Sequence, residues 1–464
     1  MKIKKLKVTL FMLVLTITTM AQDVNFRAVL PTDSPQDANQ GILPYPITQV
    51  KLPNGLNVVT IPYDSPGIAA FYIVMRVGSR DEIETGKSGF AHFFEHMMFR
   101  GTEKYPSEKY SDILKSTGAS ANANTSLDRT VYHMTGNAAM LDKMFEIEAD
   151  RFMNLKYSLQ QFKTEAGAVK GEYTKNYSSP YAQLNEKLSD VAFSTHTYKH
   201  TTMGFFQDVV DMPNQYDYSL DFFNRFYRPE YATIIVVGDV TPIQVKELAK
   251  KYFMDWKKGD FESVIPEEPE QTAVRFTHIQ VADFPPLVAL EFKGPPYLDN
   301  QIDMAAVDVL NAILFSEKSE LYNKLVVKEQ KLRSLEGSAN STRDPYLIEI
   351  QASLVKQADM QYVKDEIMKA TDMMKTKPVE QRYIDEAKNK MRYSFAMNID
   401  SPSKIAEAVA SFTWITGDPE SLNNCYRNYA KVNAADIMMV ANKFYVSNHL
   451  TVGTISADAT TPIK

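Results

Sequence analysis

The sequence predicts an α+β protein made of two tandem domains with largely antiparallel sheets. Its 464 residues, of which 44% are hydrophobic and 23% are charged, are enough for two cores of ordinary size. Short β-branched runs alternate with long amphipathic stretches across hairpin-length turns, which favours α+β domains. Both halves also end alike, because an aromatic pair precedes the last strand pattern at Phe226-Tyr227 and at Phe444-Tyr445. This echo indicates two units of one plan.

Composition marks five segments along the chain. The first 21 residues have the pattern of a signal peptide: four lysines, a short apolar stretch and the small-residue site Thr19-Met20-Ala21. Because the apolar stretch is too short to span a bilayer comfortably, we expect cleavage, a periplasmic or secreted protein and no stable membrane insertion. An uncleaved membrane anchor is the alternative. The segments are a signal peptide (1–21), a flexible lead-in (22–45), a first domain (46–257), a linker rich in Gly, Pro and acids (258–271) and a second domain (272–464).

The first domain should begin with a hairpin, in which Pro53-Asn54-Gly55 turns between strands over residues 47–52 and 56–61. A third strand is expected over residues 69–77. The later elements of this domain are a helix around residue 92, a helix at 110–116, a strand at 124–134, helices from about 138 to 175 and a strand at 233–237. The second domain should contain strands at 287–292, 346–354 and 449–455, and helices near 301–330 and 361–396.

Charge and cysteine content exclude several classes of protein. The formal net charge is −6, and removal of residues 1–21 with their four lysines takes it to −10. Such a chain lacks the basic surface of a nucleic-acid-binding protein. The single Cys425 excludes an internal disulfide framework and a cysteine-based metal site.

The run HFFEH at residues 92–96 predicts a metal-binding helix. At about 100° per residue, His92 and His96 lie roughly 40° apart, and Glu95 lies roughly 60° to the other side of His92. The opposite face would anchor the helix in a core through four apolar residues, Phe90, Phe93, Phe94 and Met97. H-x-x-E-H is the inverted form of the zinc-protease helix motif. A solvated helix face is the alternative.

Two glutamates downstream are candidates for the third metal ligand and for a residue that supports the site. Glu165 and Glu172 are seven residues apart, so both carboxylates can point the same way from one helix. A catalytic zinc takes three protein ligands and keeps an open position, and a carboxylate commonly joins two histidines. We expect Glu172 to be the third ligand and Glu165 to support a histidine N–H or the substrate amine. An exposed helix carboxylate is the alternative for Glu165.

These motifs resemble the pitrilysin/insulinase family of zinc metallopeptidases, in the branch of half-size subunits similar to the mitochondrial processing peptidase. The resemblance rests on five stretches: residues 89–102, Glu165, Glu172 at the family's spacing of 76 residues after His96, residues 118–125 and residues 226–239. It implies that each domain is an antiparallel sheet with helices packed on one face. Only the first domain contains H-x-x-E-H and would be catalytic.

The resemblance implies one zinc ion per chain, held by His92, His96 and Glu172. Glu95 would activate the zinc-bound water as general base, for hydrolysis of peptides or unfolded polypeptide segments. In this family an edge strand near the zinc pairs with extended peptide. The matching residues here are Ala121, Asn122, Ala123 and Asn124, for which an ordinary sheet edge is the alternative.

One departure concerns the Arg and Tyr that active family members receive from a second domain or from a partner. Val326 and Arg333 occupy the expected positions, so we expect a homologous non-catalytic subunit to supply the pair, with a homodimer as the other arrangement.

His196 and His200 repeat the i,i+4 spacing in a stretch that the family treats as a structural loop, so no second metal site is expected. A non-catalytic peptide-binding or scaffold subunit and a membrane-tethered assembly factor are the alternative functions.

Overall fold

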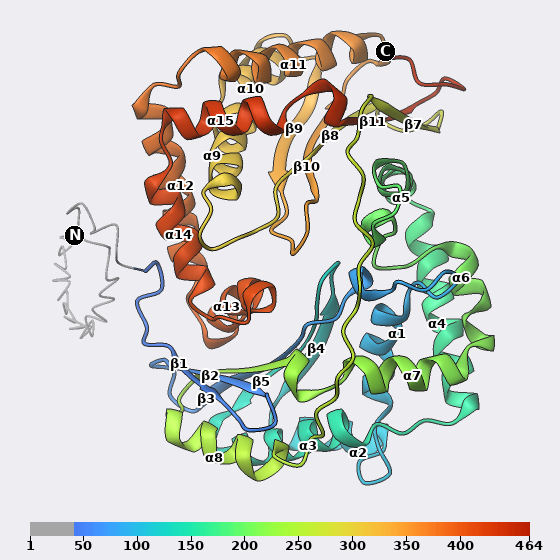
Figure 1. The fold of residues 1–464 in the computed structure, drawn as a ribbon, viewed down its shortest axis with the longest axis vertical. Helices are drawn as coiled ribbons and strands as arrows, with labels where there is room; N and C mark the ends of the chain where they lie inside the picture. Colours follow the sequence, from blue (N-terminus) through green and yellow to red (C-terminus); the bar gives the residue numbers. More distant parts are fainter. Residues whose placement is uncertain (1–40) are drawn as a thin grey trace, which may run out of the picture. The chain divides into compact units, whose positions relative to one another are not determined.

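Two β-sheets, one from each half of the chain, organise this computed structural model, which describes residues 41–464 (Figure 1). The first sheet has the order β1-β2-β6-β3-β5-β4, and its strands are β1 Thr48–Lys51, β2 Asn57–Pro62, β3 Ile68–Met75, β4 Ser120–Thr125, β5 Thr130–Asn137 and β6 Ala232–Gly238. The second has the order β7-β11-β8-β10-β9, and its strands are β7 Arg275–Gln280, β8 Leu287–Lys293, β9 Leu332–Ala339, β10 Leu347–Leu354 and β11 Leu450–Ser456.

The two sheets repeat one topology. In each, the last strand of the half inserts between two earlier strands: β6 lies between β2 and β3, and β11 lies between β7 and β8. That insertion makes the one parallel pair of each sheet, β2 with β6 and β11 with β7, and every other pairing is antiparallel. The predicted α+β class with two domains of one plan is therefore confirmed. The domain borders at residues 257 and 272 stay predictions.

Helices account for most of the remaining chain. The helices of the first half are α1 Phe90–Met97, α2 Ser107–Ser116, α3 Leu141–Asn154, α4 Leu159–Tyr177, α5 Pro180–Ala192, α6 Phe206–Asp211, α7 Tyr216–Phe226 and α8 Pro242–Phe253. Those of the second half are α9 Asp303–Phe315, α10 Glu320–Tyr322, α11 Met360–Thr376, α12 Gln381–Asn398, α13 Pro402–Thr416, α14 Ser421–Lys431 and α15 Ala434–Phe444. None of the described helices combines the length and the hydropathy that a membrane crossing requires. The predicted signal peptide and most of the predicted lead-in lie outside the described residues.

Three predicted elements differ from the structure. The strand expected over 124–134 is a hairpin, because the chain turns at residues 126–129 between β4 and β5. The helical region expected over 301–330 consists of α9, which ends at Phe315, and of α10 followed by a π-helix at Asn323–Lys328. The helix expected over 361–396 is interrupted before Gln381, since Pro378 cannot continue a helix. Amphipathic periodicity located these segments correctly, but their interruptions depend on single turn residues.

Each sheet has helices of its own half on one face and a helix of the other half on the opposite face. The second-half helix α13 packs on β3 and β6, where its Val409 and Trp414 join the core around Tyr72 and Val237. The first-half helix α5 packs on β7 and β11 through Leu184 and Leu188 (Figure 1). The exchanged helices, α5 and α13, thus join the two sheets through buried apolar contacts.

A polar cluster reinforces this junction. Asp344 of the second half accepts hydrogen bonds from Arg80 Nε at 2.5 Å and from His196 Nε2 at 3.0 Å, both in the first half. Next to it, Asp128 accepts from the Tyr198 hydroxyl at 2.8 Å and from a backbone N–H of the second half. Both ring nitrogens of His196 therefore have hydrogen-bond partners, since Nδ1 accepts from Tyr198 N at 3.0 Å.

Replacing Asp344 by Asn should lower the free energy of unfolding at pH 7 by about 1–3 kcal/mol, because two charge-assisted hydrogen bonds between the halves are weakened. Burial by itself would raise the pKa of Asp344, but the hydrogen bonds from His196 and Arg80 outweigh burial and hold the pKa well below its usual range. The ionised carboxylate therefore stabilises the protein above about pH 4, and this contribution is lost as the pH falls further. Urea unfolding of both proteins at pH 7 and at about pH 3, below the usual pKa of a free Asp, should show a smaller difference at the lower pH.

Candidate metal centre and active site

Helix α1 is fixed by burial on one side and by a carboxylate at its start. Its apolar residues Phe90, Phe93, Phe94 and Met97 are all 0% exposed. Glu82, itself buried, accepts hydrogen bonds from the backbone N–H groups of Gly89 and Ala91, each at 2.7 Å. These N–H groups belong to the first turn and have no partner within the helix. Since both the start and the apolar face are held, the opposite face must present His92, Glu95 and His96.

Helix α4 brings the two predicted glutamates to α1. It begins at Ser158, whose side chain accepts a hydrogen bond from the N–H of Gln161, and it packs on α1 where Phe162 meets Phe93 with ring centroids 5.1 Å apart. Glu165 faces this contact and its side chain is 3% exposed, whereas Glu172, two turns later, is 39% exposed. One helix therefore supplies a buried and an accessible carboxylate.

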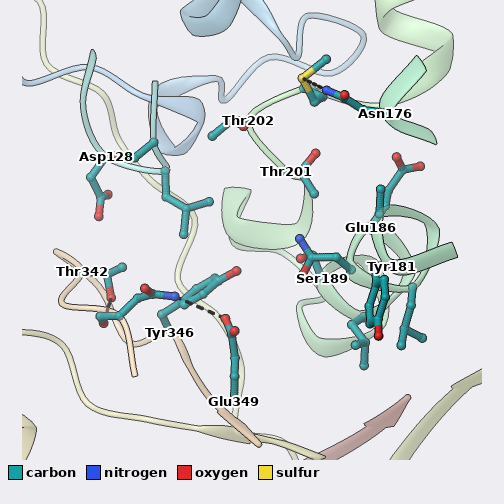
Figure 2. Close-up of a pocket in the computed structure, with 18 of the residues that line it drawn as sticks. Asp128, Asn176, Tyr181, Glu186, Ser189, Thr201, Thr202, Thr342, Tyr346 and Glu349 are labelled. Atoms are coloured by element: carbon teal, nitrogen blue, oxygen red, sulfur yellow. Dashed lines mark hydrogen bonds between the residues drawn. The ribbon is translucent and has the colours of Figure 1, made fainter. Parts of the chain in front are cut away.

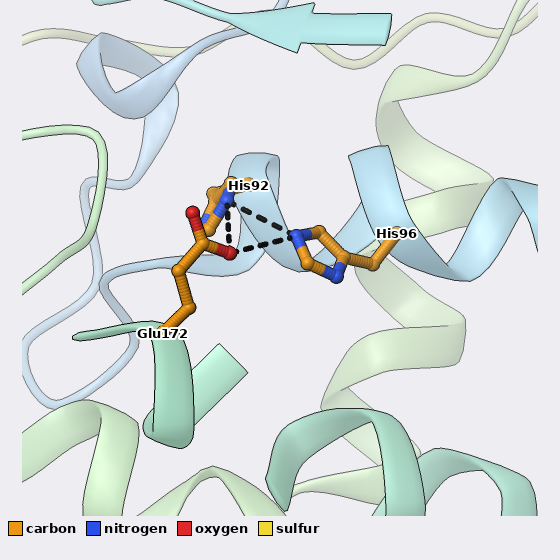
Figure 3. A group of neighbouring side chains, drawn as sticks. All are labelled: His92, His96 and Glu172. Carbon is orange, nitrogen blue, oxygen red and sulfur yellow. Dashed lines mark hydrogen bonds and ion pairs between the residues drawn. The ribbon is translucent and has the colours of Figure 1, made fainter. Parts of the chain in front are cut away.

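The three predicted ligands meet at one point (Figure 3). His92 Nε2 and His96 Nε2 are 3.2 Å apart, and Glu172 Oε2 lies 3.6 Å from the first and 3.2 Å from the second. Ligand atoms about 2.0–2.1 Å from a tetrahedral zinc are separated by about 3.3 Å, so this triangle fits the ion. Among the described residues it is the one group of three or more His, Cys, Asp or Glu side chains close enough to hold a metal.

Glu165 contacts the second histidine. Its carboxylate accepts a hydrogen bond from His96 Nδ1 at 3.1 Å, which leaves the Nε2 lone pair free for a metal. The same hydrogen bond raises the pKa of His96. Burial, together with the neighbouring His96, lowers the pKa of His92 and favours its neutral, ligating form. Arg100 also donates to Glu165; sequence analysis missed this residue, although it lies within the 89–102 motif.

Glu95 shares the face of α1 with the histidines but is outside the ligand triangle. Its Oε2 atom accepts a hydrogen bond from the Thr125 hydroxyl at 2.6 Å. Thr125 is the last residue of β4, so the carboxylate of Glu95 is tied to the end of that strand. A carboxylate beside a metal site that does not itself bind the metal has the placement of a general base.

The predicted substrate strand forms one of the two edges of the first sheet, because β4 pairs only with β5 in the described part of the chain. Ser126 N donates to Arg129 O at 2.8 Å across the hairpin. Hydrogen-bonded and non-hydrogen-bonded pairs alternate in an antiparallel ladder. The backbone groups of Ala121, Ala123 and Thr125 therefore point away from β5, toward the open edge. The substrate role of residues 121–124 stays a prediction.

A cavity of about 1080 Å³ adjoins the site. Figure 2 shows its walls, which come from α4 and α5, from the β4–β5 turn and from residues 340–351 and 411–414 of the second half. Tyr173, directly after the ligand Glu172, lines it together with Arg129, Tyr181, Tyr346 and Glu349. The cavity is therefore lined by both halves of the protein, and Tyr173 in its wall directly follows Glu172 in the sequence.

Val326 and Arg333, where the sequence analysis expected an Arg and a Tyr, belong to the second half. Val326 lies in the π-helix and packs on the core of the second sheet. Arg333 lies on β9, and its Nε donates to the carbonyl of Leu354 at 3.3 Å. Both side chains thus contact their own domain.

Removal of a ligand should remove the metal. We expect Glu172→Ala and His96→Ala to purify with less than about a tenth of the wild-type zinc, because two protein ligands hold the ion far more weakly than three. Glu165→Gln, which keeps all three ligands, should retain zinc with about 10- to 100-fold weaker affinity. Elemental analysis and competition with a chelator measure both effects. Full zinc content in Glu172→Ala would contradict the ligand assignment.

Two family models match the chain. The model described as "Insulinase (Peptidase family M16)" matches residues 58–204, and the "Peptidase M16 inactive domain" matches residues 215–391. The first match contains the whole ligand set and Glu95. The second covers most of the second sheet, which lies in the half without H-x-x-E-H.

Individual relatives agree. The zinc protease PqqE of Helicobacter pylori is 30% identical over 411 residues, 87% of this chain and 91% of that protein. A probable mitochondrial-processing peptidase subunit beta of Arabidopsis thaliana is 25% identical over 89% of this chain and 79% of its own length. The crystal structure of a protease from Helicobacter pylori superimposes with a TM-score of 0.82 at 27% identity, over 89% of this chain and 99% of that one. With its ligands assembled on α1 and α4, the chain belongs to the pitrilysin/insulinase (M16) family and is a zinc metallopeptidase of that family, a single half-size unit.

Proposed function

We propose that this protein is an endopeptidase that cleaves peptides or unfolded polypeptide segments, with Glu95 as general base. The observation that carries the proposal is the position of Glu95: it shares one face of α1 with two ligands, lies outside their triangle and is held by Thr125. A fourth ligand would fill the position that a catalytic zinc keeps open.

The chain's own residues move the proton. A bound zinc ion would polarise the scissile carbonyl and lower the pKa of a coordinated water to about 7. Glu95 takes the proton from the attacking water and passes it to the leaving amine, so the carboxylate is regenerated at the end of the reaction. Glu165 keeps His96 in the tautomer that leaves Nε2 available throughout.

Extended peptide is the substrate that this site suits. The outward backbone groups of Ala121, Ala123 and Thr125 can pair with another strand, which requires a segment without secondary structure of its own. The cavity of about 1080 Å³ lies at the upper end of the range of about 300–1000 Å³ for ligand pockets and has room for a chain of several residues.

We further infer that the protein acts in the periplasm or is secreted, and that it works with a second subunit. The signal-peptide pattern of residues 1–21 supports the first inference. The second is supported by the contacts of Val326 and Arg333, and by the name of the Arabidopsis relative, which is a subunit. A homologous chain would supply the Arg and Tyr. Full peptidase activity of the pure, monomeric protein would contradict a required partner.

Replacing Glu95 by Gln tests the general base. The amide keeps the size and the acceptor oxygen for Thr125 but cannot take up a proton, so kcat on an unstructured peptide should fall about 10²- to 10⁴-fold. Zinc content should stay at the wild-type level, because the ligand set is intact. A zinc-loaded Glu95→Gln protein with undiminished activity would exclude this role.

Strand addition predicts a periodic response to backbone blocking. In a series of peptides that each carry one N-methyl group, alternate positions should raise KM about tenfold, because every second N–H of an added strand points at β4. The intervening positions should have little effect, since their N–H groups point away. Cleavage rates of the series, measured by mass spectrometry, reveal the period. An equal response at all positions would argue against pairing with β4.

A further inference from the structure

We propose that Thr125 is a positioning residue that couples peptide docking on β4 to the orientation of the general base. The inference deepens the proposed function and rests on it. The side chain of Thr125 donates a hydrogen bond to Glu95. Its backbone lies on the open edge of β4, where a peptide strand would pair. Among the described residues, Thr125 alone combines these two contacts.

The side-chain contact restrains Glu95. The Thr125 hydroxyl donates to Oε2 at 2.6 Å, and no other hydrogen bond or ion pair to the Glu95 carboxylate occurs among residues 41–464. Hydrogen bonds to a charged acceptor are stronger than those between neutral groups. With Oε2 anchored in this way, Oε1 is the oxygen left to receive a proton. Without the hydroxyl, the carboxylate could rotate about its side-chain torsions.

The backbone of Thr125 is the substrate-facing part. The alternation that starts at the Ser126–Arg129 hydrogen bond makes Thr125–Thr130 a non-hydrogen-bonded pair, so the N–H and C=O of Thr125 face outward. A peptide that pairs along β4 as far as its end would therefore hydrogen-bond to the same residue that holds the base.

The chain beyond Thr125 is fixed by a close backbone approach. Leu127 O accepts from Arg80 N at 2.7 Å, and the Thr130 hydroxyl donates to Val77 O at 3.0 Å. A Cβ atom on Gly78 would lie 2.4 Å from Leu127 O, so only glycine permits this approach. The turn is thus held firmly by the 77–80 segment, while the edge of β4 before it stays open. A docked strand would restrain the open side and complete the fixation of Thr125.

The test compares Thr125→Val, which is similar in shape but lacks the hydroxyl, with Thr125→Ser, which keeps it. For the zinc-loaded full chain, together with any subunit it proves to require, Thr125→Val should lower kcat about tenfold on an unstructured peptide, with KM within about twofold and zinc content unchanged. Thr125→Ser should stay within about threefold of wild-type kcat. An unchanged kcat in Thr125→Val would overturn the proposal. An equal loss of kcat in Thr125→Ser would also overturn it, because the loss would then not depend on the hydroxyl.

Glu95→Gln, measured in parallel, separates the two levels of inference. If Glu95→Gln is fully active, the proposed function fails. If it is inactive while Thr125→Val is normal, only the role of Thr125 fails.

The coupling itself has a distinct readout. If docking at Thr125 orients Glu95, one N-methylated peptide should lower kcat in wild type in addition to raising KM. This loss of kcat should be several-fold smaller in Thr125→Val, because the link to Glu95 is already broken. An equal loss in both proteins would show that Thr125 does not connect the strand to the base.

Discussion

The complete burial of one face of α1 is the constraint on which the active site depends. Four apolar side chains of an eight-residue helix are inaccessible to solvent, and the helix start is closed by the buried carboxylate of Glu82. Each large apolar side chain stabilises the fold by about 1.5–3 kcal/mol when buried, so rotation of the helix would expose several side chains and lose this free energy for each. Packing of the apolar face therefore fixes the direction in which the histidines and Glu95 point.

A second consequence of packing is the tie between the two halves. Because α5 covers the second sheet and α13 covers the first, neither sheet has both faces covered by its own helices. Gly453 of β11 shows how close the contact is, since a Cβ atom there would lie 2.8 Å from the Leu188 side chain. The second half lacks ligands, yet it supplies walls of the cavity beside the metal centre.

Strand β4, at an edge of the first sheet, presents its side chains and its backbone groups in different directions. Alternation along β4 directs the side chains of Ala123 and Thr125 toward α1, while their backbone groups face the open edge. Small side chains at residues 121 and 123 leave room beside the helix, and the hydroxyl at 125 reaches Glu95. The geometry of a pleated strand, with its period of two, lets Thr125 direct its hydroxyl to Glu95 and its backbone groups to the open edge of the sheet.

The sequence by itself determined the fold class, the tandem plan and the ligand set, because each follows from local periodicity or fixed spacing. The i,i+4 histidines and the seven-residue interval between Glu165 and Glu172 specify faces of helices whatever surrounds them. Tertiary structure alone decided that residues 124–134 form a hairpin, that Arg100 joins Glu165, that Thr125 holds Glu95 and that α5 and α13 are exchanged. Apart from the hairpin, whose turn is local, these features are contacts between segments 30 to several hundred residues apart in the chain, and their energies come from packing and hydrogen bonds that no local pattern encodes.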